Sequence, residues 1–229
     1  SSIVKSAIEF DVNLIIFSGS ITSKLNQANS LFPPIHSLSS TDKIDGLILG
    51  YSSIGNQWIF NFKNRIIEMY KSFPVVNLGS KLDTIPSVTI DNFDGAYKIV
   101  EHLIKVHGYR RFAYLRGPEK NNDARIRFNA FKKALKDYNI PISPHLTAFT
   151  DFTEYTAKNT IRKIIQEHGL VFDAVVCCND QIAYGVLKGI KELGYSIPGD
   201  TAVVGFDGLN LNKFYHPHLT SVRQPFQEA

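Results

Sequence analysis

Short apolar runs rich in β-branched residues alternate along this chain with longer segments in which apolar residues recur at the period of an α-helix. The short runs are typical of strands buried on both faces, and the longer segments are typical of helices that cover a sheet. A helix between two neighbouring strands brings the second strand back parallel to the first. The pattern therefore predicts an α/β fold in which helices cover both faces of doubly wound parallel sheets.

Glycines mark the ends of the predicted helices. Gly108, Gly169 and Gly194 each stand just past a periodic segment, where a left-handed residue closes the last turn. Residues 19–42 are rich in Ser, Asn and Pro, and they predict an irregular connection. The predicted strands are residues 13–18, 45–50, 74–79, 87–90, 111–117, 173–178 and 201–206, and the predicted helices are residues 62–72, 94–107, 123–138, 153–168 and 181–193.

The composition is that of a soluble globular protein, since 44% of the 229 residues are hydrophobic and 20% are charged. No apolar stretch approaches the roughly 18 residues of a membrane span, and Lys5 and Glu9 interrupt the segment where a signal peptide would be apolar. The net charge of +4 comes from scattered basic residues. Basic residues are concentrated in two segments, KVHGYRR and FKKALK. Such segments are typical of solvated helix faces, and a nucleic-acid patch is the alternative. We expect a cytoplasmic protein without a membrane anchor.

The two cysteines, Cys177 and Cys178, are neighbours in the sequence. Their Cα atoms lie about 3.8 Å apart across a trans peptide, whereas disulfides prefer about 4.4 to 6.8 Å, so a disulfide between them is excluded. The histidines nearest in sequence are His168, His216 and His218, which do not complete a metal-ligand spacing. We expect two buried thiols at the end of a strand, with no redox or metal role.

Sequence motifs of catalysis and of phosphate binding are absent from the chain. There is no G-x-x-x-x-G-K-[ST], no G-x-G-x-x-G after a strand, no G-x-S-x-G and no H-E-x-x-H. The sequence therefore predicts a protein that is not an enzyme and holds no metal or cofactor.

Polar residues follow several predicted strands at their carboxyl ends, which is the edge of an open α/β sheet where ligands bind. Asp91 and Asn92 follow one strand, residues 117–123 follow another, and Asn179 and Asp207 follow two more. We expect Asn179 to contact a ligand, because its amide group can both donate and accept. We expect the next residue, Asp180, to cap the following helix.

The predicted helix 123–138 carries Arg127 near its start, on the same face as its apolar residues. A guanidinium group there is costly unless it has a partner, which indicates either a ligand contact or an ion pair with Asp123 four residues earlier. Asp151 and Phe152 add an acceptor and an aromatic face at another strand end, a combination suited to a polyol or a heterocycle. The alternative for Phe152 is a residue of the hydrophobic core.

Four separated motifs resemble the effector-binding core of the lac and galactose repressor family, namely TIDNFDGAYKIVEHLIKVHGYRRFAYLRGP, DARIRFNAFKKAL, FDAVVCCNDQIAYGVLKGIKELGYSIPGDTAVVGFDG and HPHLTSVRQPF. The resemblance covers residues 74–226 in order. It implies a type I periplasmic-binding-protein-like fold, with two α/β lobes joined by three crossing segments and a small ligand clamped between them. By resemblance, residues 1–90 form a partial first lobe, residues 91–223 the ligand-binding lobe, and residues 224–229 the third crossing. The family's pocket residues fall on Asp91, Asp123, Arg127, Phe152, Asn179, Asp207 and Gln224.

A narrower resemblance links FSGSITS, KIDGLILG, SFPVVNLGSKLDTIPSVTIDN and VHGYRRFAYLRGP to repressor-type sensor modules of bacterial signalling proteins. The resemblance implies a homodimeric, non-enzymatic sensor of a sugar-like metabolite that signals by ligand-dependent lobe closure. DNA would be bound only through a helix-turn-helix that this chain lacks, and the other output would be a fused kinase or cyclase. The alternative is a structural or dimerisation module that kept the fold and lost the ligand.

Overall fold

The computed structural model describes residues 2–16, 44–50, 74–79, 81, 84–210 and 216–225. The chain divides into two compact units, Ser1–Ile90 with Pro225–Ala229 (unit 1) and Asp91–Gln224 (unit 2).

Unit 1 contains one helix and one small parallel sheet within its described residues. The sheet order is β1-β2-β3, and each strand is parallel to its neighbour. The predicted strand at residues 13–18 is wrong for residues 13–16, which form no strand, and its last two residues lie outside the described part. The predicted connection 19–42 and helix 62–72 also lie outside it. The elements are α1 (Ser2–Glu9), β1 (Leu47–Leu49), β2 (Val75–Leu78) and β3 (Ser87–Val88).

Unit 2 is built on a five-stranded sheet whose order is β5-β4-β6-β7-β8 and whose strands are all parallel. From β4 the chain moves first to one side, to β5, and then back across to β6, β7 and β8. The order therefore reverses between β4 and β6, and a doubly wound sheet binds ligands at the carboxyl ends of the strands beside such a switch point. The strands are β4 (Phe112–Arg116), β5 (Thr147–Phe149), β6 (Ala174–Cys177), β7 (Ala202–Asp207) and β8 (Thr220–Arg223).

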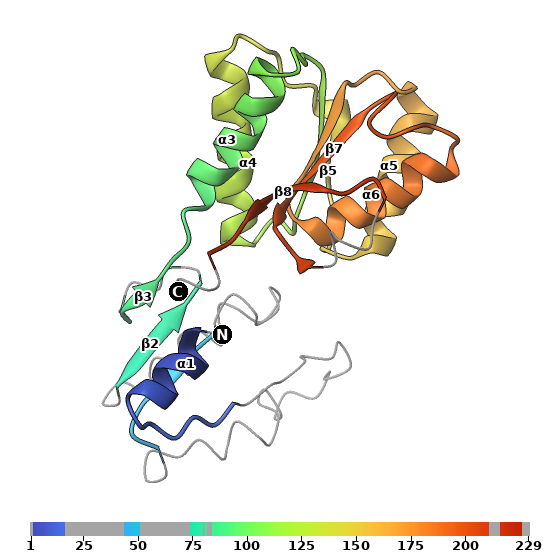
Figure 1. The fold of residues 1–229 in the computed structure, drawn as a ribbon. Coiled ribbons are helices and arrows are strands. Elements are labelled where there is room, and N and C mark those ends of the chain that lie inside the picture. The colour runs from blue at the N-terminus through green and yellow to red at the C-terminus, as the bar shows by residue number, and fades with distance from the viewer. Residues whose placement is uncertain are drawn as a thin grey trace, which may run out of the picture. The chain divides into compact units, whose positions relative to one another are not determined.

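Four α-helices cover the two faces of this sheet. Helices α3 and α4 pack together on one side, and α5 and α6 pack together on the other (Figure 1). This arrangement follows from the direction of the crossovers, since the connection through α4 and the connections through α5 and α6 run in opposite directions across the sheet. The helices are α3 (Asn92–Lys105), α4 (Asn122–Asp137), α5 (Glu154–His168) and α6 (Asp180–Glu192), and a short 3₁₀ helix, η4 (Pro144–Leu146), precedes β5.

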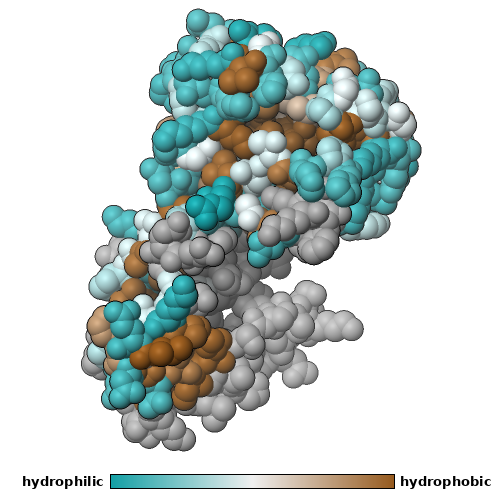
Figure 2. All heavy atoms as spheres, viewed as in Figure 1, coloured by the Kyte–Doolittle hydropathy of each residue, from teal (hydrophilic) through white to brown (hydrophobic). Residues whose placement is uncertain are grey.

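The hydrophobic core of unit 2 lies between the sheet and its two helical layers. All four residues of β6 are buried, as expected for a central strand covered on both faces. The face shown in Figure 2 has hydrophilic residues on the outside of unit 2 and a band of hydrophobic residues between them. None of the described helices is long and apolar enough to cross a membrane.

The predicted α/β class with parallel sheets is confirmed, and the helices of unit 2 begin and end within two residues of the predicted positions. Gly108, Gly169 and Gly194 have positive φ angles of 69°, 75° and 84°, which confirms the left-handed conformation expected at the helix ends. Strand β8 was not predicted, and β5 was indicated only as a strand end before Asp151, without bounds. Both lie at the edges of the sheet and are less buried than β6, so their apolar patterns are weaker.

Candidate functional site

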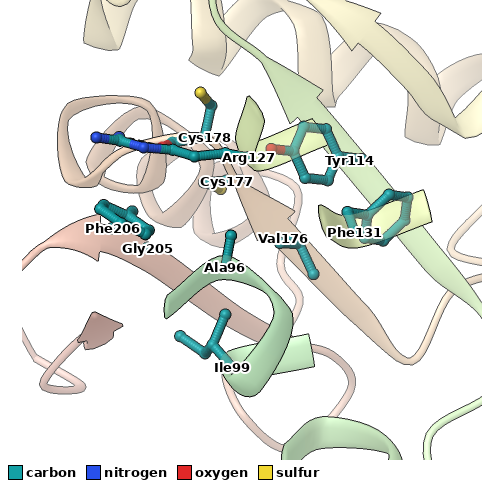
Figure 3. Close-up of a pocket in the computed structure, with 10 residues that line it drawn as sticks. All are labelled: Ala96, Ile99, Tyr114, Arg127, Phe131, Val176, Cys177, Cys178, Gly205 and Phe206. Carbon is teal, nitrogen blue, oxygen red and sulfur yellow. Dashed lines mark hydrogen bonds between the residues drawn. The ribbon is translucent and has the colours of Figure 1, made fainter. Parts of the chain in front are cut away.

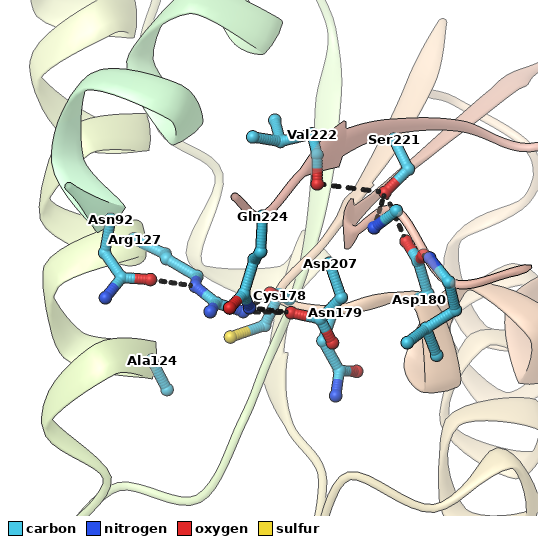
Figure 4. Close-up of polar contacts among 12 residues, drawn as sticks. Asn92, Ala124, Arg127, Cys178, Asn179, Asp180, Asp207, Ser221, Val222 and Gln224 are labelled. Carbon is cyan, nitrogen blue, oxygen red and sulfur yellow. Dashed lines mark hydrogen bonds and ion pairs between the residues drawn. The ribbon is translucent and has the colours of Figure 1, made fainter. Parts of the chain in front are cut away.

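The candidate site lies in unit 2 at the carboxyl ends of β6 and β7, next to the switch point of the sheet. All seven residues that the sequence indicated belong to unit 2. Figure 4 shows a subset of them, Arg127, Asn179, Asp207 and Gln224, close to the ends of these strands.

Arg127, on the second turn of α4, is the centre of the site and is only 7% exposed. Its Nε donates to Oδ1 of Asn92 (2.8 Å), and its Nη1 donates to the main-chain carbonyl of Cys178 (2.8 Å). Nη1 also lies 3.4 Å from Oδ1 of Asp207, and the guanidinium stacks 3.7 Å from the centre of the Phe206 ring. The ion pair of Arg127 is therefore with Asp207 rather than with Asp123, and it has the partners that a buried cation requires.

Asp207 is the last residue of β7, with a φ of 126° that non-glycine residues rarely adopt. Its Oδ1 accepts a hydrogen bond from Nε2 of Gln224 (2.5 Å), and its carbonyl accepts one from the Gln224 main-chain N–H (3.1 Å). Burial raises the pKa of Asp207 to about 6, although Arg127 and Gln224 act to lower it. Strained backbone of this kind is common at binding sites, where the surrounding structure holds it in place.

The predicted roles at the start of α6 are corrected at one residue. Asn179, not Asp180, caps the helix, and its Oδ1 accepts from the main-chain N–H of Ile182 (2.9 Å). Asp180 is fully buried, and its two oxygens accept from the main-chain N–H of Leu209 (2.8 Å) and from Oγ of Ser221 (2.5 Å). The prediction of Asp180 as the cap was wrong because its carboxylate binds Leu209 in the β7–β8 connection and Ser221 of β8 instead of the first turn of α6.

Four side chains of the site use one or two polar atoms within the protein and keep a further atom that makes no hydrogen bond to a described residue. Arg127 keeps Nη2, and Asn179 keeps Nδ2. Asp207 keeps Oδ2, and Gln224 keeps Oε1. The site therefore offers two donors and two acceptors on side chains that are already held in place, an arrangement suited to a ligand with several hydroxyl groups.

The other three residues indicated by the sequence lie near this group, and the structure shows a local role for two of them. Asp91 caps α3, accepting from the main-chain N–H groups of Phe93 and Asp94. Asp123 is half-buried on the first turn of α4, one turn before Arg127. Phe152 has a φ of 71°, and its ring lies so close to Gly117 at the end of β4 that a Cβ there would be 2.3 Å from it.

Comparison with known proteins identifies the family to which this chain belongs. A family model described as periplasmic binding protein-like domain matches residues 100–229, more than half of the chain. The chain belongs to the periplasmic binding protein-like domain family. The resemblance to the lac and galactose repressor family that the motifs indicated is thereby confirmed, and the relatives of this chain are repressors of that kind.

Three relatives show the extent of the similarity. The HTH-type transcriptional repressor PurR of Haemophilus influenzae is 28% identical over 162 residues, which cover 65% of this chain and 48% of that protein. A regulatory protein of the LacI family from Chloroflexus aggregans has 26% identity and a TM-score of 0.80, over 99% of this chain and 77% of that one. A LacI family transcriptional regulator from Enterococcus faecium with bound ribose has 25% identity and a TM-score of 0.68, over 82% and 68%. The chain spans about half the length of the curated relatives it matches.

A small void in this periplasmic binding protein-like domain lies behind Arg127, between the sheet and the α3–α4 layer (Figure 3). It measures about 10 Å³, and Tyr114, Cys177 and Cys178 contribute to its lining. A void of this size has room for about one water molecule, so it is an internal packing space.

The cysteines are free thiols, and both are buried, as predicted. Burial raises the pKa of the Cys177 thiol well above its usual value and also raises that of Cys178, which disfavours the reactive thiolate. The described residues contain no group of three or more metal-ligating side chains.

Asn92 follows a predicted strand together with Asp91, but it was not among the site residues predicted from the sequence. It is 7% exposed and binds Arg127 across 35 residues of sequence, so its role depends on a contact between two helices. The available signal was a polar residue directly after a strand, and Asp91 and Asn92 share that signal.

Proposed function

We propose that this chain is the ligand-sensing domain of a bacterial transcription regulator and that its ligand is a small neutral polyhydroxyl metabolite, a sugar or a close relative. The observation that carries the proposal is the set of open atoms on Arg127, Asn179, Asp207 and Gln224. The PurR relative is a transcriptional repressor, and the regulator from Enterococcus faecium has ribose bound, which supports this class of function and of ligand.

The charges of the site favour a neutral ligand. Arg127 already pairs with Asp207, and Asp91 and Asp123 leave an excess of carboxylate over cationic groups among the proposed site residues. An anionic sugar phosphate would meet this excess, whereas vicinal hydroxyl groups can donate to Oδ2 and Oε1 and accept from Nη2 and Nδ2. The ring of Phe152 would cover an apolar face of the sugar.

The response to ligand follows from the family's architecture. We propose that the ligand closes two lobes by binding the closed state more tightly than the open state, that the chain works as a homodimer, and that a helix-turn-helix or a signalling module outside this chain provides the output. Binding occurs without turnover, since the site residues include no nucleophile beside a general base.

Thermal unfolding with a ligand panel tests the proposal. The panel contains ribose, cellobiose, other sugars, nucleosides and amino acids, and a ligand at about 100 times its Kd should add about 2.7 kcal/mol of stability. Arg127→Ala and Asp207→Ala should lose the shift. Asn179→Ser should weaken it while keeping the helix cap, because Ser caps helices well and lacks the amide donor.

Arg125→Ala is the matched control, because Arg125 lies on the same helix and its contact with Oδ1 of Asn122 is exposed. It should keep the full shift. A full shift in both Arg127→Ala and Asp207→Ala would place the ligand elsewhere, and no shift with any compound class would favour a structural or dimerisation module. Consumption of a panel compound would contradict binding without turnover.

A further inference from the structure

Unit 2 begins and ends next to two residues of the site. The chain passes from unit 1 to unit 2 between Ile90 and Asp91, and it returns to unit 1 between Gln224 and Pro225. Asn92 is one residue beyond the first passage, and Gln224 is the last residue before the second.

Asn92 ties the first passage to the site. It is the first residue of α3, is 7% exposed, and accepts from Nε of Arg127 at 2.8 Å through Oδ1. A buried hydrogen bond to a charged group is stronger than a neutral one and fixes the direction of the guanidinium plane. The position of Arg127 is therefore linked to the position of the α3 start.

Gln224 ties the second passage to the site with two bonds to a single residue. Its Nε2 donates to Oδ1 of Asp207 at 2.5 Å, and its main-chain N–H donates to the Asp207 carbonyl at 3.1 Å. Asp207 has the rare φ of 126°, so these bonds hold a strained residue in one conformation.

The ion pair of Arg127 and Asp207 connects the Asn92–Arg127 hydrogen bond to the Gln224–Asp207 hydrogen bonds. Nη1 of Arg127 lies 3.4 Å from the same Oδ1 that Gln224 binds. The result is a continuous polar chain from Asn92 through Arg127 and Asp207 to Gln224, which Figure 4 shows. It joins both passages between the units to the two charged groups whose remaining atoms, Nη2 and Oδ2, are open.

We infer that Asn92 and Gln224 are positioning residues that couple the Arg127–Asp207 pair to both segments where the chain passes between its units. This inference deepens the proposed function, on which its meaning for a ligand rests: a molecule that binds the pair would act directly on both passages. Gln224, which the sequence indicated as a ligand contact, then has a second role through its Nε2, and Asn92 acts on the pair through its hydrogen bond with Arg127.

Protonation of Asp207 tests the coupling without any ligand. Among the described residues, the charged or titratable groups beside Asp207 are Arg127 from α4, Asp180 from α6 and the Cys178 thiol after β6. Protonation removes the charge that attracts Arg127, so it perturbs the pair selectively. In NMR titrations of the full chain, we expect the main-chain amides of Asp91, Asn92 and Gln224 to shift with the midpoint of the Asp207 carboxyl, near pH 6.

Variants separate coupling from a merely structural effect. Asn92→Ala should remove the response of the first passage and keep that of Gln224. Asn92→Asp should restore it, because it keeps an oxygen acceptor for Nε. The hydrogen bond from Gln224 lowers the pKa of Asp207, so its removal in Gln224→Leu should move the Asp207 midpoint to higher pH. Asp207→Asn should abolish the response at both passages.

Tyr97→Phe is the matched control, because it removes another hydrogen bond between α3 and α4, from the Tyr97 hydroxyl to Oδ2 of Asp137, without touching the pair. It should leave every midpoint unchanged. Two results would overturn the inference. The amide chemical shifts of residues 91–92 could fail to follow the Asp207 titration in the unaltered chain, or they could follow it to the same extent in Asn92→Ala. The titration of the unaltered chain and Asp207→Asn decide the question even if Asn92→Ala fails to fold. A failure of the ligand panel would leave these results unaffected.

Discussion

Two side chains of this site each bind the protein with one polar atom and leave the other polar atom available to a ligand. Asn179 caps α6 with Oδ1 and leaves Nδ2 open, and Asp207 binds Gln224 with Oδ1 and leaves Oδ2 open. Because one atom of each side chain is held internally, the open atom is already oriented before a ligand arrives, which lowers the entropy cost of binding.

The pH dependence of stability should show the cost of ionising Asp207. Its pKa is raised from 3.8 to about 6 in the folded state, so the folded protein binds this proton between those pH values and the unfolded chain does not. The contribution of Asp207 to the free energy of unfolding therefore rises as the pH falls from about 7 to 4, by about 3 kcal/mol at 1.36 kcal/mol per pH unit.

Urea unfolding of the unaltered chain and of Asp207→Asn over this pH range provides the measurement. The difference between the two curves isolates Asp207, because histidines and other carboxylates titrate in both proteins. Curves that stay parallel from pH 7 to pH 4 would show that Asp207 has no raised pKa.

At the scale of the elements, the two helices of each layer pack against each other in different ways. Both helix pairs make polar contacts, such as Tyr97–Asp137 between α3 and α4 and Lys158–Glu192 between α5 and α6, but α5 and α6 also approach closely at a glycine. A Cβ at Gly185 would lie 2.3 Å from the carbonyl oxygen of Glu154 and 2.8 Å from Cβ of Ala157. The backbone of α6 therefore lies directly against the first turns of α5.

Gly185→Ala should push these helices apart. Ala favours helices, but the new methyl group would meet main-chain atoms that cannot rotate away, and overpacking of this kind costs about 1–3 kcal/mol. Thermal unfolding measures the loss. Gly194→Ala is the comparison, because no atom lies within 4 Å of its Cβ position and only its φ of 84° is strained, at about 1–2 kcal/mol. A stabilised Gly185→Ala would show that the two helices have room between them.

At the scale of the whole molecule, the described hydrophobic core and all the proposed site residues belong to unit 2. The five described strands of the unit 2 sheet, from the edge strand β5 to the edge strand β8, all lie within Asp91–Gln224. The stability of the site should therefore be a property of this unit.

A fragment of residues 91–224 should fold alone and unfold in one cooperative transition, followed by circular dichroism. A shorter fragment that ends at residue 205 is the control. It lacks Phe206 and Leu219 of the core, and it leaves the buried Asp180 without Leu209 and Ser221. It should fail to fold, because a buried charge without partners is costly. A broad, non-cooperative transition in the longer fragment would show that unit 2 depends on unit 1.

The amino-acid sequence by itself determined the α/β class, the helices of unit 2 and the edge of the sheet where polar residues gather. These properties depend on periodicity and on helix ends, which are local in the chain, so residues such as Gly108, Gly169 and Gly194 reveal them directly. The repressor-like motifs gave the family, which the match of residues 100–229 confirms.

Only the tertiary structure decided how the polar residues divide their roles. The pairing of Arg127 with Asp207, the use of Asn92 as its second partner and the binding of Asp180 to Leu209 all depend on contacts between segments far apart in sequence. A side chain's neighbours at a sheet edge are set by strand order and by the angle at which each strand ends, and neither quantity is written in the local pattern. Sequence placed these groups at one edge of the sheet, and packing determined which of their atoms bind each other and which bind no described residue.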